Sequence, residues 1–248
     1  MTYNLIGDIH GRNTWRQLVR TDMINIFLGD YLDPYDRDNL QADSTEYDNL
    51  QDIIRFKQQH PETILLLGNH DLHYLWDEHY SRYNGEHAER YAQLIREHLH
   101  LFQAAYAIGD RLLVTHAGVT RPWLQLAGIS HQQSASQLAE AICRCMSDEE
   151  SRHLFSVEST FHPDDSCGIS PTASPIWVRP HTLLDHGLFV DHRGDIIYQV
   201  VGHTQIGQIM QFESCVFVDC LGTVPQSLRI TFDAAGEPIF APLPAKIQ

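Results

Sequence analysis

The stretch Ile64-Leu65-Leu66-Leu67-Gly68-Asn69-His70-Asp71 carries the most informative pattern of the sequence. Four apolar residues in a row, ended by a glycine, predict a short buried strand. An amide, an imidazole and a carboxylate follow the glycine. We therefore expect the strand to release three polar side chains into a loop at the edge of a sheet, where ligands commonly bind. Taken alone, the stretch is also typical of an ordinary turn, because Asn and Gly are common turn residues.

The same pattern occurs four more times along the chain. Each case is an apolar run that ends in a turn of small residues carrying Asp or His: Tyr3–Ile6 before Gly7-Asp8-Ile9-His10-Gly11, Ile24–Leu28 before Gly29-Asp30, Leu112–Thr115 before His116-Ala117-Gly118, and Ile196–Val201 before Gly202-His203-Thr204. One such run would be noise. Five of them indicate a single site that is assembled at the ends of strands.

Helices are predicted between the first three strands. We expect a short helix over Asn13–Arg20, and a longer helix that begins at the capping pair Thr45 and Asp48 and stops at His60-Pro61. A strand-helix-strand-helix-strand order predicts βαβ units with parallel pairing.

The rest of the chain predicts a helical middle and an all-β end. Leu72–Phe102 has helical spacing, and Ala104–Ile108 with Leu112–Thr115 predicts a hairpin. The block Thr120–Phe161 is helical and amphipathic, a long loop covers His162–Pro175, and strands follow from Val200 onward. We expect one domain over residues 1–248, of the α/β class (α+β in some schemes), with two facing sheets. About residues 120–175 form an insertion that either caps the site or only packs.

Composition excludes several classes of protein. With 43% hydrophobic and 20% charged residues, the chain is ordinary for a soluble globular protein. No apolar run approaches the roughly 20 residues that span a bilayer. No signal peptide precedes the first strand, so we expect a cytoplasmic protein without a membrane partner. The net charge of -15 disfavours nonspecific nucleic-acid binding. The 5 cysteines form no CxxC pair, which favours reduced thiols.

The polar residues at the strand ends are oxygen and imidazole donors without a thiolate: Asp8, His10, Asp30, Asn69, His116 and His203. Such a set suits divalent ions such as Mn, Fe or Zn. Six donors are too many for one ordinary zinc site and suit two ions about 3.5–4 Å apart that share a bridging carboxylate. Two such ions activate water and bind phosphoryl oxygens, so the donors predict hydrolysis by metal-activated water.

The ordered set GDIHG, GDYLD, GNHD, HAG and GHT resembles the calcineurin-like metallophosphoesterases, and specifically the phosphoprotein phosphatase family. The usual forms in that family are GDxHG, GDxVDRG, GNHE, HGG and GHT. The match spans residues 7 to about 204, and Phe217–Gly222 looks like the strand that follows GHT in the family. The ordered set is highly specific. It implies the metallophosphatase fold, a four-layer β-sandwich flanked by helices.

The resemblance implies which residues hold metal. One ion would take a carboxylate, an imidazole and a bridging carboxylate: Asp8, His10 and Asp30. The second ion would share the bridging carboxylate and add an amide and two imidazoles: Asn69, His116 and His203. The implied cofactors are therefore two divalent ions, of Mn, Fe or Zn.

The resemblance also implies a catalytic pair. His70 would protonate the leaving oxygen or stabilise its charge without binding metal. Asp33 would orient His70 through a hydrogen bond that fixes the tautomer of the imidazole.

Substrate phosphate would contact Asn69 and arginines, and here the sequence departs from the family. The family carries a phosphate-binding arginine directly after Asp33, whereas this chain has Pro34. Arg37 either reaches inward in its place or is a solvated loop residue. Arg179 lies at about the place of a second arginine of the family, and a guanidinium suits bidentate phosphate binding.

The remaining differences are smaller. Asp71 replaces the glutamate of GNHE, a shorter carboxylate that we expect to be tolerated. The histidines outside the motifs, including His73, are interpreted as ordinary residues. Among them, His181 is the first to check.

The predicted function is that of a dimetal-dependent phosphatase. It would hydrolyse phosphate monoesters of a phosphoprotein or a small phosphorylated molecule, by attack of a metal-bridging water or hydroxide. The alternative within the family is a bis(5'-nucleosyl)-tetraphosphatase-type hydrolase of dinucleoside polyphosphates, which the few basic residues and the missing arginine disfavour. A non-catalytic metal-bound binding module is disfavoured because His70 and the donors are all present.

Overall fold

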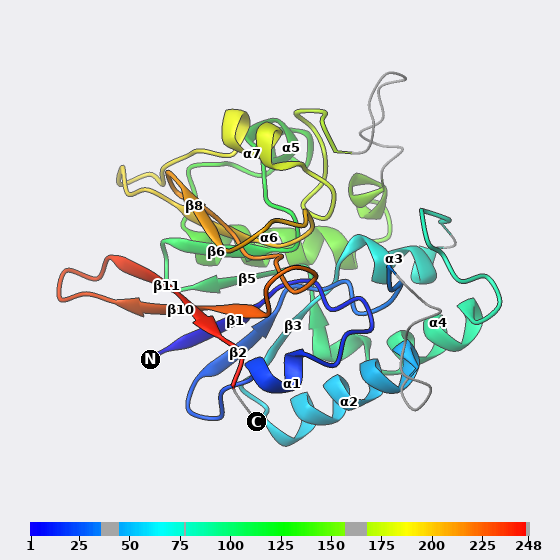
Figure 1. Ribbon diagram of the computed structural model, residues 1–248. Coiled ribbons are helices and arrows are strands. Elements are labelled where there is room, and N and C mark those ends of the chain that lie inside the picture. The colour runs from blue at the N-terminus through cyan, green and yellow to red at the C-terminus, as the bar shows by residue number, and fades with distance from the viewer. Residues whose placement is uncertain (36–44, 77, 157–167, 247–248) are drawn as a thin grey trace. The chain divides into compact units, whose positions relative to one another are not determined.

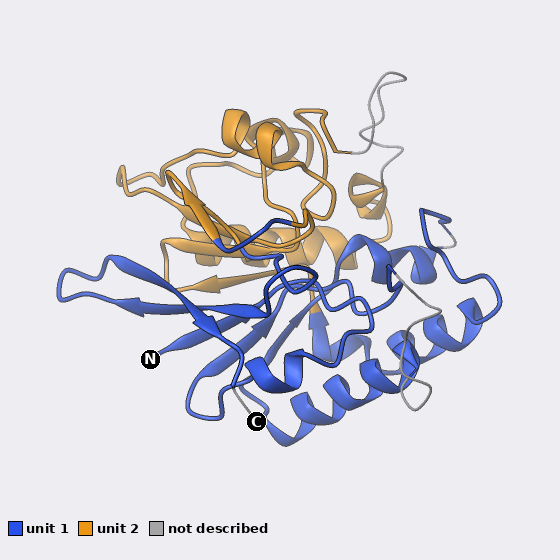
Figure 2. Cartoon of the chain, in the orientation of Figure 1, with its two compact units in different colours: residues 1–102, 206–209, 218–248 blue, residues 103–205, 210–217 orange. Residues whose placement is uncertain are grey.

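The computed structural model describes residues 1–35, 45–76, 78–156 and 168–246 (Figure 1). The chain divides into two compact units (Figure 2). Unit 1 comprises Met1–Phe102, Ile206–Ile209 and Val218–Gln248, and unit 2 comprises Gln103–Gln205 and Met210–Phe217. The sequence-based expectation that residues 1–248 form one domain stays a prediction.

The first sheet has six strands in the order β11-β10-β1-β2-β3-β4. Their bounds are β1 (Tyr3–Ile6), β2 (Ile24–Phe27), β3 (Ile64–Leu66), β4 (Phe102–Gln103), β10 (Gln226–Phe232) and β11 (Pro238–Pro244). β1 pairs with β2, and β2 with β3, in parallel, while β10 pairs with β1 and with β11 in antiparallel. The predicted parallel βαβ order is therefore confirmed.

Two helices connect the parallel strands, α1 (Trp15–Leu18) and α2 (Glu46–Gln59). The side chain of Thr45 accepts a hydrogen bond from Asp48 N, so α2 begins at the predicted cap. The predicted helix over Asn13–Arg20 is wrong in length, because only one turn of it forms. Trp15 anchors that turn, since its ring meets Phe27 of β2 and Phe56 of α2 edge to face at 5.8 Å in each case.

The helical stretch after β3 forms α3 (Asn69–Trp76), α4 (Ala88–Glu97) and a 3-10 turn over Leu99–Leu101. The loop predicted after Gly68 is therefore wrong, because the polar residues that follow it form the first turn of α3. The amide N–H of His70 in that turn donates to the side chain of Asp30 at 2.9 Å. A carboxylate at this end satisfies a helix N–H that has no partner within the helix.

The second sheet has five strands in the order β5-β6-β7-β9-β8. Their bounds are β5 (Ala105–Ile108), β6 (Leu112–Thr115), β7 (Tyr198–Val201), β8 (Met210–Phe212) and β9 (Cys215–Phe217). β5 and β6 pair in antiparallel, which confirms the predicted hairpin, and β7 lies parallel to both β6 and β9. The strands β7 to β11 form the predicted all-β end.

The helices of unit 2 are α5 (Arg121–Leu126), α6 (Ala135–Ser147), α7 (Pro180–His186) and a 3-10 turn over Arg152–Phe155. α6 contacts β5 and β6, and it buries Leu138 and Ile142 completely. This helix of the predicted insertion therefore packs on the sheet of its own unit. Part of that insertion and of the predicted loop, residues 157–167, lies outside the described residues.

Both units thus combine a mixed sheet with helices, which confirms the predicted fold class. Among the residues that the structure describes, no helix has the length and apolar character needed to cross a membrane.

Close backbone approach makes Gly29 essential at the end of β2. A Cβ at Gly29 would lie 2.5 Å from the backbone nitrogen of Gly68, and its φ of 105° is in the left-handed region. Gly29→Ala is expected to cost about 2–5 kcal/mol of unfolding free energy, from strain and overpacking together. Urea unfolding measures this loss.

Gly236→Ala is the matched control, because Gly236 has a φ of 84° but nothing lies within 4 Å of a Cβ added there. That control is expected to cost only about 1–2 kcal/mol. Equal losses in the two variants would contradict the close-approach explanation.

Candidate active site

The loop after β1 carries Asp8 and His10, and both side chains are buried. Nδ1 of His10 lies 2.9 Å from the carbonyl oxygen of Leu32. Nδ1 therefore carries the proton and donates, and Nε2 faces Oδ2 of Asp30 at 3.6 Å. Burial lowers the pKa of His10 to about 3, so the imidazole is neutral at physiological pH. A neutral imidazole with a fixed tautomer is the form that binds metal.

Asp30 lies in the loop after β2 and links that loop to the loop after β1. Its backbone φ is 50°, a left-handed conformation that Asp tolerates better than most residues. Its carbonyl oxygen accepts from the backbone nitrogens of Ile9 at 3.1 Å and His10 at 2.7 Å. Ligand atoms of Asp8, His10 and Asp30 all lie within 4.8 Å of one another. Two buried carboxylates at such a distance repel one another, and a divalent cation between them relieves that repulsion. The donor set therefore fits a metal ion.

Asn69 is the first residue of α3 and is buried. It precedes His70, whose Nδ1 lies 2.8 Å from Oδ2 of Asp33. The structure thus brings together the two residues that the resemblance assigns to the catalytic pair. The proton on Nδ1 points to the carboxylate, which leaves Nε2 on the opposite side of the ring.

The carboxylate of Asp33 contacts two residues besides His70 that the sequence motifs do not include. Besides His70, Nε2 of His73 lies 2.7 Å from its Oδ2, and the hydroxyl of Tyr74 donates to its Oδ1 at 2.5 Å. Burial alone would raise the pKa of Asp33, but the favourable interactions with His70, His73 and Tyr74 outweigh it, and the net shift is downward. Asp33 is therefore a carboxylate at neutral pH. The sequence interpretation treats His73 as an ordinary residue, and the structure places it against Asp33, three residues after His70 on α3.

Asp71 links the ends of β2 and β3. Its buried carboxylate accepts hydrogen bonds from the backbone nitrogens of Asp30 at 2.8 Å, Tyr31 at 2.9 Å and Gly68 at 2.9 Å. The bond from Gly68 resembles the returning half of a capping box at the start of α3. Asp71 therefore holds the two loops that carry Asp30, Asn69 and the catalytic pair.

Asp71→Asn is expected to lower the free energy of unfolding by about 2–4 kcal/mol. The amide keeps the shape of the carboxylate but turns an N–H toward buried backbone donors. Urea unfolding of the metal-free protein measures the loss. Asp52→Asn serves as the control, because Asp52 forms solvent-accessible ion pairs with Arg16 and Arg55. Its cost is expected to stay below about 1 kcal/mol. A loss of that size for Asp71→Asn as well would mean that the three hydrogen bonds do not hold the loops.

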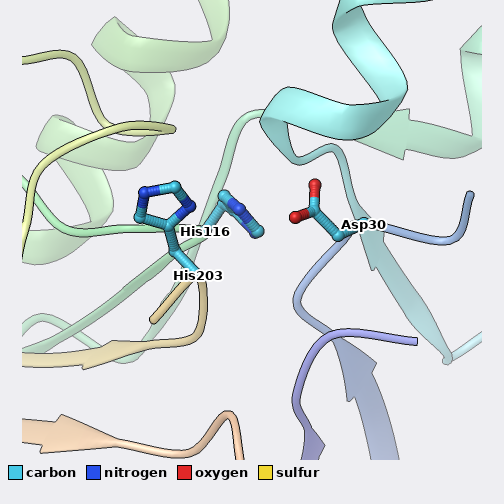
Figure 3. Close-up of side chains that lie close together, drawn as sticks. All are labelled: Asp30, His116 and His203. Carbon is cyan, nitrogen blue, oxygen red and sulfur yellow. The ribbon is translucent and has the colours of Figure 1, made fainter. Parts of the chain in front are cut away.

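Unit 2 supplies a pair of histidines. His116 follows β6 and His203 follows β7, both are buried, and their ring centroids lie 5.1 Å apart. The amide of Gly202 donates to the carbonyl oxygen of His116 at 2.7 Å and fixes one loop to the other. Figure 3 draws both rings with Asp30 and shows the loops from which each side chain comes. The parallel pairing of β6 with β7 explains why the two histidines meet.

The predicted phosphate-binding arginines have different outcomes. Nη1 of Arg179 donates to the hydroxyl of Thr204 at 3.2 Å, so it lies next to His203 in the same unit. Arg37 lies outside the described residues. His181, by contrast, has a side chain that is 88% exposed, 3.5 Å from Asp185, as an ordinary surface residue would be. Arg82 belongs to no sequence motif, yet its Nη2 lies 2.9 Å from Nε2 of His70.

The family of the chain is shown by its sequence. Residues 1–206 match the family model of the calcineurin-like phosphoesterases. Because this match covers most of the chain, the protein belongs to that family. It is therefore a metallophosphoesterase, a phosphoric ester hydrolase, as the motifs predict. Its family implies a dinuclear centre of divalent metal ions.

Solved structures agree on the fold. One is described as a protein serine/threonine phosphatase from Saccharomyces cerevisiae with similarity to human phosphatase PP5. It is 17% identical, the match covers 100% of this chain and 81% of that chain, and the TM-score is 0.50. At this identity the likeness concerns the fold alone. Comparison with curated protein sequences gives no match.

Proposed function

We propose that the enzyme hydrolyses phosphate monoesters, of a phosphoprotein or a small phosphorylated molecule, with two divalent ions of Mn, Fe or Zn. The observation that carries the proposal is the His70–Asp33 contact of 2.8 Å. It lies in the same unit as the Asp8, His10 and Asp30 group, and the ring of His10 meets that of His70 at 5.2 Å. Metal ligands and an oriented imidazole side by side can together catalyse hydrolysis of a phosphate ester.

The proposed ligands follow the family assignment. Three residues of unit 1 would hold one ion: Asp8, His10 and Asp30. The second ion would use Asp30 again together with three further donors: Asn69, His116 and His203. When bound, the two ions supply an activated water and neutralise phosphoryl oxygens. The burial of every one of these side chains supports ligation, because buried carboxylates and imidazoles need a partner of opposite or complementary charge.

His70 would act on the leaving oxygen. In the proposed reaction, Nε2 of the doubly protonated ring gives its proton to the oxygen that departs with the alcohol. Nδ1 keeps its own proton, which is hydrogen-bonded to Asp33. The carboxylate stabilises the positive charge of the doubly protonated ring, and His73 with Tyr74 keeps the carboxylate in place. Asn69 and Arg179 would contact the phosphoryl oxygens, the former from the start of α3 and the latter from its position beside Thr204.

A panel of substrates tests this proposal. Purified protein loaded with Mn, Fe or Zn would be assayed with phosphoserine, phosphothreonine and phosphotyrosine peptides, p-nitrophenyl phosphate and diadenosine tetraphosphate. We expect the monoesters to be hydrolysed fastest, and EDTA to abolish the activity. Preference for diadenosine tetraphosphate would favour the dinucleoside polyphosphate hydrolase instead. No hydrolysis of any member by protein with bound metal would favour the non-catalytic binding module. The net charge of -15 supports a substrate other than nucleic acid.

A further inference from the structure

Arg82 lies in the segment between α3 and α4 and reaches the catalytic pair. Its Nη2 is 2.9 Å from Nε2 of His70, and its Nη1 donates to the carbonyl oxygen of Asp33 at 3.1 Å. The guanidinium carbon lies 3.7 Å from the ring centroid of Tyr35. Three neighbours therefore fix a positive charge beside His70.

The segment around Arg82 is built onto the same network as Asp33. The ring of Tyr83 stacks on that of Tyr74 with centroids 4.9 Å apart, and the backbone nitrogen of Asn84 donates to the hydroxyl of Tyr74 at 2.9 Å. That hydroxyl in turn donates to Asp33. Arg82 itself has a φ of 68°, which turns the chain back toward the site. Asp33, the residue that orients His70, thus also helps to place the guanidinium of Arg82.

A phosphate oxygen can replace the present hydrogen-bond acceptors of the Arg82 guanidinium. Two of its hydrogen bonds go to neutral acceptors, the imidazole nitrogen of His70 and the carbonyl oxygen of Asp33. An anionic phosphoryl oxygen is a stronger acceptor than either, and a planar guanidinium can bind two such oxygens at once. The ring of Tyr35 beneath Arg82 also meets the ring of His10 at 5.0 Å. A phosphate beside His10 and His70 is therefore within the neighbourhood of Arg82.

We propose that Arg82 binds a non-bridging oxygen of the substrate phosphate. The carbonyl that it contacts belongs to the Asp33–Pro34 peptide, so a distant segment brings a guanidinium to the point where the chain has proline in place of the family arginine. When phosphate takes Arg82, the guanidinium no longer donates to Nε2 of His70. The inference rests on the proposed function, because it concerns phosphate at the same site.

Two variants remove the charge in different ways. Arg82→Met keeps the length of the side chain, and Arg82→Gly suits the left-handed backbone and so protects folding. In the full, Mn-loaded chain, either change is expected to weaken binding of inorganic phosphate, measured by calorimetry, by about tenfold. With p-nitrophenyl phosphate, kcat/KM is expected to fall by about 10²-fold. Arg90→Met is the matched control, because Arg90 also lies 3.7 Å over a tyrosine ring, that of Tyr47, on the exposed face of α4. Its phosphate affinity is expected to stay within about twofold of wild type.

A double variant separates phosphate binding from mere support of His70. If Arg82 binds phosphate, Arg82→Met weakens phosphate binding by a similar factor in the wild-type and His70→Asn backgrounds. An unchanged phosphate affinity in either Arg82 variant, or a loss that disappears in the His70→Asn background, would overturn the inference. These readouts do not need turnover. If the wild-type protein hydrolyses no phosphate ester, the proposed function fails, and phosphate calorimetry still decides the role of Arg82.

Discussion

Asp30→Asn is expected to lower the affinity of the protein for both metal ions and to abolish most of its turnover. Asp30 is the carboxylate that the proposed site shares between the two ions, so one substitution removes a ligand from each. Even the loss of a residue that only supports a metal ligand typically costs about 10–100-fold in affinity, and the loss of a bridging ligand should exceed that. We expect metal affinity to fall by more than about 10²-fold, and kcat/KM at limiting metal by about 10³-fold or more.

Asparagine is chosen so that the fold survives. It has the shape of aspartate and tolerates the left-handed φ of 50° at this position. Its side-chain oxygen can still accept the hydrogen bond from the backbone nitrogen of His70. Metal content by mass spectrometry and competition with a chelator measure the effect, with Asp52→Asn as a control of equal charge change on the surface. Wild-type metal content in Asp30→Asn would remove Asp30 from the proposed centre.

His70→Asn is expected to do the reverse: metal content stays near wild type while kcat falls by about 10²–10⁴-fold, the usual loss when a general acid is removed. The amide nitrogen of Asn can replace Nδ1 as a donor to Asp33, so the neighbouring network is preserved. What is lost is the group at the position of Nε2. His181→Asn is the control, because His181 is 88% exposed on its side chain.

The leaving group sharpens this second prediction. p-Nitrophenolate departs readily without a proton, whereas the alkoxide of serine does not. The loss in His70→Asn should therefore be smaller with p-nitrophenyl phosphate than with a phosphoserine peptide. Equal losses with both substrates would argue against proton donation, and metal loss equal to that of Asp30→Asn would make His70 a ligand.

Much of the fold was predictable because its signal is local. The apolar runs of β1, β2, β3, β6 and β7 are short, buried and ended by small residues, and the order of strands and helices fixes parallel pairing. The start of α3 was not predictable in the same way. Polar residues after Gly68 indicate a turn, and the partners that make them helical, Asp30 for the N–H of His70 among them, come from another strand.

The residues of the candidate site likewise differ in whether a local sequence pattern indicates them. The residues of the family motifs were predicted because their spacing is specific. His73, Arg82 and the role of Asp71 were not, because each depends on a contact with a residue of another motif or segment. Arg82 is 12 residues from His70 in the chain and reaches it only because the segment between α3 and α4 turns back. A lone arginine in a polar stretch carries no such information in the sequence.

Anomalous diffraction from crystals of the Mn-loaded protein locates metal ions without assuming activity. Two manganese peaks are expected about 3.5–4 Å apart, with Asp30 bound to both. One peak should contact Asp8 and His10, and the other should contact His116 and His203. A single peak, or manganese bound away from Asp30, would contradict the proposed dinuclear centre.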